Sequence, residues 1–143
     1  MNRQQTAAKN YLMRAYRVDQ RIENKLEQIQ LLNDLAAKAT VTYSDMPGSP
    51  NRNVHKMEDV LVKIIDIKTE INADMLELVD LKKETMDCIK QVDDPELQLI
   101  LELRYLNYVG WEQIAGDLGY GIDNVFRLHR KALDFIEVPE TLQ

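Results

Sequence analysis

Residues 111–130 read WEQIAGDLGYGIDNVFRLHR, and their apolar spacing is that of a helix-turn-helix. Ile114 and Leu118 lie four positions apart on one helix face, with the small residue Ala115 beside them where a second helix can cross closely. Gly119 follows at once, and glycine accepts the positive φ that often ends a helix. A second apolar face then opens, formed by Val125, Leu128, Ala132 and Leu133.

A second helix docked in this way leaves its other face free, and in DNA-binding helix-turn-helix domains that face enters the major groove. Segment 122–133 carries three basic residues, Arg127, Arg130 and Lys131, against Asp123 alone, a local charge of +2. The basic residues therefore lie on the helix that would enter the groove, where they could contact DNA. The alternative is a structural helical hairpin that never meets DNA, and we favour DNA binding because the turn, both faces and the charge agree.

Composition favours a small, purely helical protein. The 143 residues suit one domain, or one domain with a coiled-coil arm, and five glycines and four prolines with 29% charged residues favour long helices over sheet. The single cysteine, Cys88, excludes an internal disulfide and a cysteine-based zinc cluster. No segment is apolar enough to span a bilayer and no signal-like stretch opens the sequence, so we expect a cytoplasmic protein in a bacterial host cell without membrane association.

Residues 6–39 predict an amphipathic helix, because apolar residues recur at steps of three and four with no glycine or proline between them. Its first half is basic, and two interpretations stay open: an arm that contacts phosphates, or a solvated helix face, which we favour. The basic residues in question are Arg3, Lys9, Arg14, Arg17 and Arg21.

A loop is expected over residues 40–53, followed by a second long helix over 54–92 with a heptad seam that Asp74 and Thr85 interrupt. The two helices should pair as an antiparallel hairpin. The second helix has a surplus of apolar residues outside its seam, which predicts another copy of the chain as a partner, in a homodimer or higher homo-oligomer. These surplus residues are Leu61, Ile65, Met75, Leu76, Val79 and Met86.

A third helix should begin at the sequence Asp94-Pro95, because aspartate caps helices and proline suits the first helical position. With the two helices of the helix-turn-helix it would form a small trihelical domain. The sequence thus predicts an all-α fold in two parts: a helical hairpin and oligomerisation arm over 1–92 and a helix-turn-helix domain over 93–143.

The block from Pro95 to Leu133, centred on LELRYLNYVGWEQIAGDLGYGIDNVFRLHRKAL, resembles region four of bacterial sigma factors. It is similar still more closely to small phage-encoded regulators of the ArpU and RinA type, which carry such a domain behind a helical part. The resemblance implies a transcriptional regulator of phage genes that binds promoter DNA. The residues that carry it are Leu103-Arg104-Tyr105, Trp111, Glu112, Ile114, Ala115, Leu118-Gly119-Tyr120, Arg127-Leu128-His129 and Ala132-Leu133.

Transferred to this sequence, the groove-facing positions of the family become Ile122, Asp123, Phe126, Arg127 and Arg130, with Lys131 near the DNA backbone. Arg127 suits a bidentate contact to guanine, and Asp123 suits an acceptor for cytosine. Arg130 and Lys131 suit phosphates. The sequence departs from the family pattern in having Gly121 at the usual polar cap and apolar residues at 122 and 126, which would meet thymine methyl groups or protein.

Catalytic residues, metal ligands and cofactor motifs are not expected, because the sequence offers no grouping of nucleophile, base and orienting residue and both histidines stand alone. Three functions remain. The first is a DNA-binding transcriptional regulator. The second is a phage DNA-packaging subunit of the small terminase kind, which would also bind double-stranded DNA. The third is a module that contacts RNA polymerase and does not bind DNA itself.

Overall fold

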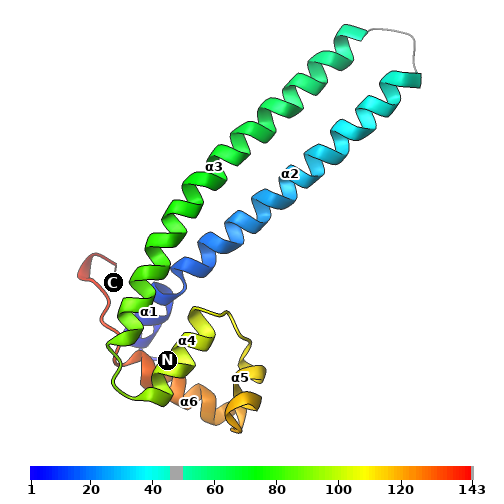
Figure 1. Cartoon of the computed structure of the whole chain (residues 1–143). Helices are drawn as coiled ribbons and strands as arrows, with labels where there is room; N and C mark the ends of the chain where they lie inside the picture. Colours follow the sequence, from blue (N-terminus) through cyan, green and yellow to red (C-terminus); the bar gives the residue numbers. More distant parts are fainter. Residues whose placement is uncertain (46–49, 143) are drawn as a thin grey trace. The chain divides into compact units, whose positions relative to one another are not determined.

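The computed structural model describes residues 1–45 and 50–142, with side chains described for 1–38 and 55–142 (Figure 1). These residues form helices joined by short connections and contain no strand, which confirms the predicted all-α fold. Within the same residues, no helix is both long and apolar enough to cross a membrane. The helices are α1 (Arg3–Leu12), α2 (Arg14–Asp45), α3 (Pro50–Lys90), α4 (Pro95–Tyr105), α5 (Trp111–Leu118), α6 (Ile122–Leu133) and the short 3-10 helix η1 (Glu140–Leu142).

The helix expected over residues 6–39 is two helices, divided at Met13. The Met13 N–H still donates to the Lys9 carbonyl, but the Tyr11 carbonyl accepts from the Arg14 side chain, whose Nε lies 3.0 Å away. No glycine or proline marks this division in the sequence. Both long helices also extend into the expected loop 40–53, because residues 40–45 end α2 and Pro50 is the first residue of α3; residues 46–49 lie outside the described part.

Two compact units divide the chain: residues 1–18 with 78–143, called here the core unit, and residues 19–77, called the hairpin unit. This division differs from the predicted boundary between residues 92 and 93. The physical reason is that α1 and the end of α3 contribute buried side chains to the same core as α4 and α6. That core contains Ala8, Leu12, Ile89, Val92, Leu97, Ile100, Leu101, Tyr105, Leu128, Ala132, Leu133 and Ile136.

The hairpin unit pairs α2 with α3 in antiparallel directions (Figure 1). The seam residues Ile22, Ile64 and Ile71 are buried, as the heptad spacing predicts. The polar interruption at Asp74 is also buried, and its carboxylate accepts from Lys25 Nζ at 2.6 Å and Arg21 Nη1 at 3.3 Å. Lys25, which replaces an apolar residue in the α2 seam, is therefore the partner of the acidic residue in the α3 seam.

Candidate nucleic-acid interface

The turn between α5 and α6 is built on Gly119, whose φ of 72° lies in the left-handed region. The Tyr120 N–H donates to the Ala115 carbonyl at 3.0 Å and so satisfies one of the carbonyls exposed at the end of α5. Gly121 then precedes α6 with extended backbone and makes no side-chain cap. The sequence prediction of a helix, a glycine turn and a second helix beginning at Ile122 is confirmed.

The buried face of α6 packs into two clusters of apolar side chains. Val125 packs with Ile114 and Ala115 of α5 in a small cluster, in which the small side chain of Ala115 lies at the contact as predicted. Leu128 and Ala132 belong instead to the main core with α1 and α4. Because packed side chains on both sides fix its rotation, α6 presents one defined face to solvent.

Three rings lie beneath this exposed face. Nε2 of His129 is 2.6 Å from the Tyr105 hydroxyl, and the Trp111 ring meets the imidazole edge-on with centroids 4.5 Å apart. Burial and, to a smaller extent, the positive charges of Lys9, Arg104 and Arg130 together lower the pKa of His129 from 6.5 to about 4. His129 is therefore a neutral, buried packing residue at physiological pH.

Five of the six predicted site residues are exposed on α6, and the sixth, Phe126, is half-buried with its ring 5.5 Å from the Trp111 ring. Phe126 therefore packs at least partly against protein. Arg127 donates from Nε and Nη2 to Asn124 Oδ1 at 3.2 and 2.8 Å, which orients its guanidinium along the helix. The exposed residues are Ile122, Asp123, Arg127, Arg130 and Lys131.

The N-terminal helix supports α6, a contact that the sequence analysis missed. Gln5 Nε2 donates to the Arg130 carbonyl at 3.1 Å and to the Asp134 carboxylate at 2.9 Å, while Gln4 Nε2 donates to the Leu133 carbonyl at 3.3 Å. These amides satisfy carbonyls left without intrahelical partners at the end of α6. Glutamines at positions 4 and 5 carry no local pattern that predicts this role.

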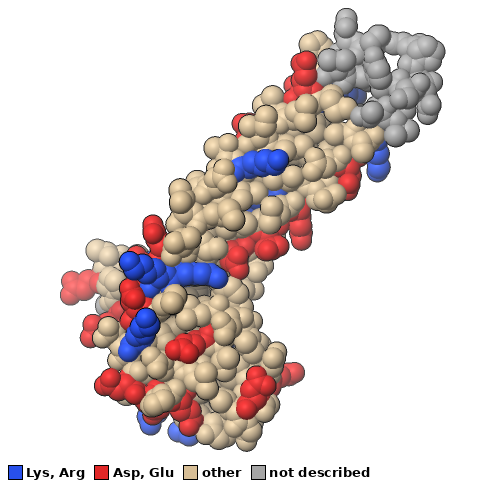
Figure 2. Space-filling model, in the orientation of Figure 1, with Lys and Arg blue, Asp and Glu red and all other residues tan. Residues whose placement is uncertain are grey.

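Most basic residues of the N-terminal arm are engaged with neighbouring side chains. Arg14 Nη2 lies 2.7 Å from Glu84, Arg21 contacts Asp74 and Glu77, and Arg17 donates to Asn10. For these three arginines the structure fits a structural role better than a phosphate-contacting one. Acidic side chains are spread over the visible face of the molecule in Figure 2, in keeping with the net charge of −6.

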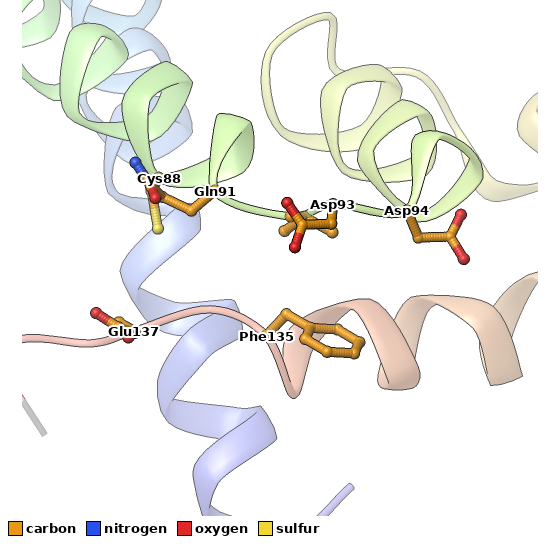
Figure 3. A pocket seen from close by; sticks show the side chains of 7 residues that line it. Cys88, Gln91, Asp93, Asp94, Phe135 and Glu137 are labelled. Atoms are coloured by element: carbon orange, nitrogen blue, oxygen red, sulfur yellow. The ribbon is translucent and has the colours of Figure 1, made fainter.

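A hollow of about 430 Å³ lies where the end of α3 faces the segment after α6, between Cys88 on one side and Phe135 and Glu137 on the other (Figure 3). Cys88 is half-buried, and burial raises the pKa of its thiol. The thiol is therefore protonated at neutral pH and a poor nucleophile. Cys88 packs against the main core as a small, partly buried side chain.

The fold and the exposed α6 place the chain among helical proteins with a helix-turn-helix arrangement. The chain belongs to a family whose description is "Protein of unknown function (DUF1492)", which matches residues 48–137, more than half of its length. The match includes α3 and the whole of α4, α5 and α6. No curated protein and no solved structure matches the chain.

Proposed function

We propose that this chain is a DNA-binding transcriptional regulator, encoded by a phage, that dimerises through its long helices and binds promoter DNA through α6. The observation that carries the proposal is the exposed face of α6, where Arg127, Arg130 and Lys131 stand on a helix whose opposite face is fixed by buried Val125 and Leu128. A rigid helix with basic residues on its free face is what readout in a major groove requires.

The proposed contacts follow from side-chain chemistry and position. Arg127 is nearer the α6 N-terminus, the end that reads bases in helix-turn-helix domains, and its planar guanidinium matches the O6 and N7 acceptors of guanine. Asp123, one turn earlier, would accept from the amino group of cytosine. Arg130 and Lys131 lie further along α6, where contacts to phosphates fix the position of the protein on the duplex.

The proposal of an oligomer is based on apolar side chains of α3 that no other described part of the chain covers. Leu61, Ile65 and Leu76 are at least half exposed, although the buried seam of the same helix faces α2. Residues 61, 65, 68, 72, 75 and 79 follow steps of three and four and form a second stripe on α3 beside its seam. Four of these residues are apolar and two, Lys68 and Asn72, are polar, while Leu76 lies next to the stripe. Two copies joined along this stripe would present two α6 helices to a palindromic site.

Replacing Ile65 and Leu76 together with glutamate tests the oligomer. Light scattering after gel filtration should give a dimer mass for the natural protein and a monomer mass for this variant, because each glutamate would be buried unpaired in the interface. The control places glutamate at Lys63, an exposed position of α3 outside this stripe, and should remain dimeric. A natural protein that is monomeric contradicts dimerisation, and a ring of many copies points to a packaging subunit.

A second candidate, a module that contacts RNA polymerase, is favoured by one observation. Tyr120 and Ile122, at the turn before α6, are each 37% exposed and place apolar surface beside the basic residues. A triple variant with alanine at Arg127, Arg130 and Lys131 separates the two functions. As a DNA-binding regulator it should lose DNA binding and promoter control while its helix content is unchanged, whereas a polymerase-contacting module should keep its control of transcription.

A further inference from the structure

A small hollow of about 200 Å³ opens beside the exposed face of α6, and its lining brings residues near the N-terminus together with residues of the helix-turn-helix. Lys9 of α1 and Arg130 of α6 supply two cations, and the rings of Trp111, Phe126 and His129 supply the rest of the wall together with Met1. A basic residue that is distant in sequence thus lies next to a predicted phosphate contact.

Lys9 is held at this place by the packing of α1 on α6. Gln5, one helical turn before Lys9, donates to the Arg130 carbonyl and to Asp134, and Ala8 and Leu12 are fully buried in the shared core. One turn further along the same face of α1, Lys9 reaches the level of Phe126 and Arg130. The backbone of α1 at Lys9 is therefore held in place by buried contacts, and the Lys9 side chain itself is half-buried.

The charge around the hollow is positive. Among the charges that perturb the pKa of His129 are Lys9, Arg104 and Arg130, all of which lower it, and none is a carboxylate. In the described part of the chain, neither Lys9 nor Arg130 takes part in a salt bridge, in contrast to Arg14, Arg21 and Lys25. The nearby acid Asp134 already accepts from Gln5. Two cations without an acidic partner suit an anion.

The position of the hollow on α6 indicates which anion. Residues on a helix turn by about 100° each, so Phe126 and Arg130 lie on one flank of the face centred on Asp123 and Arg127, and Lys131 lies on the other flank. A helix in the major groove has one sugar-phosphate strand on either side. We propose that Lys9 and Arg130 bind neighbouring backbone phosphates of one DNA strand, while Lys131 contacts the other strand. This inference rests on the proposed function and makes α1 part of the DNA-binding surface.

The test uses the full chain and a fluorescein-labelled random-sequence duplex, with anisotropy measured over a series of salt concentrations. Each phosphate contact contributes about 0.9 to the slope of log K against log salt concentration. Lys9→Gln keeps the aliphatic stem and removes the charge, so it should weaken binding several-fold at low salt and reduce the slope by about one. Lys9→Arg should restore the slope, and the control Lys63→Gln, at an exposed position of α3, should leave it unchanged.

The outcomes separate the inference from the function on which it rests. If Arg130→Gln reduces the slope and Lys9→Gln does not, Lys9 makes no phosphate contact and the inference is overturned, while the proposed function stands. An equal loss in Lys63→Gln also overturns it, because the effect would then be one of total charge. If the natural protein binds no duplex at any salt concentration, the proposed function fails and the inference fails with it.

Discussion

The Tyr105 hydroxyl lies 2.6 Å from Nε2 of His129, and the two rings stack with centroids 5.7 Å apart. Both residues are buried, and the pair joins α4 to α6 directly beneath the exposed basic face. A hydrogen bond in such surroundings is specific, because neither group finds water if the other is lost. The orientation of α6 therefore depends on a polar contact as well as on apolar packing.

Removing the hydroxyl with Tyr105→Phe should lower the free energy of unfolding by about 1–3 kcal/mol, since it leaves a ring nitrogen of His129 buried without this partner. Urea unfolding followed by circular dichroism measures the loss. Tyr120→Phe is the matched control, because Tyr120 is exposed, and it should change stability by less than about 0.5 kcal/mol. Equal stability of Tyr105→Phe and the natural protein would show that the contact contributes nothing.

The lowered pKa of His129 predicts a loss of stability in mild acid. The unfolded chain takes up a proton near pH 6.5 and the folded chain only near pH 4, so unfolding is favoured as pH falls through this interval. Between about pH 7 and about pH 5 the free energy of unfolding should fall by about 2 kcal/mol. Urea unfolding at several pH values measures the slope. His129→Gln should make the free energy of unfolding less dependent on pH, whereas the control His55→Gln, at an exposed position, should leave the pH dependence unchanged. If the pH dependence persists in His129→Gln, other groups cause it.

Substitution by alanine should have opposite effects on stability at two glycines of the helix-turn-helix, Gly119 and Gly116. Gly119→Ala should destabilise the protein by about 1 kcal/mol because its φ of 72° strains any residue with a Cβ, although no atom lies within 4 Å of the added carbon. Gly116→Ala, inside α5 and equally open, should stabilise it by about 0.5–1 kcal/mol. Thermal unfolding of both variants gives the comparison, and a stabilising Gly119→Ala would contradict the turn geometry.

We expect the buried carboxylate of Asp74 to contribute strongly to the stability of the hairpin unit. The hydrogen bond with Lys25, with further help from Arg21, holds the pKa of Asp74 below its ordinary 3.8. The stability that it contributes is thus present above that pH and lost as pH falls further. Asp74→Ala should cost about 1–3 kcal/mol by leaving Lys25 without this partner, whereas Asp80→Ala, at an exposed position of α3, should cost little. Urea unfolding at neutral pH compares the two, and equal costs would contradict the pairing.

The sequence predicted those features that local rules determine. The Asp94 cap, the Gly119 turn and the buried face of α6 each depend on residues within a few positions, and all are present. The contacts of Gln4 and Gln5 join residues more than 120 positions apart, so no local pattern carries them. The division at Met13 leaves the apolar spacing of the helix intact, so it could not be predicted from the sequence either. For the same reason Lys9 could not be told from the other basic residues of its helix.

The central claim is that the α6 face reads DNA, and the most direct measurement is fluorescence anisotropy on duplex fragments of the genome that encodes the chain, with random duplex alongside, at several salt concentrations. We expect one fragment to bind with a sub-micromolar dissociation constant and a modest salt slope, and the random duplex to bind far more weakly. The alanine variant of Arg127 should lose the preference for that fragment. Equal, weak and strongly salt-dependent binding to every duplex, or no binding, would contradict the claim and favour the module that contacts RNA polymerase.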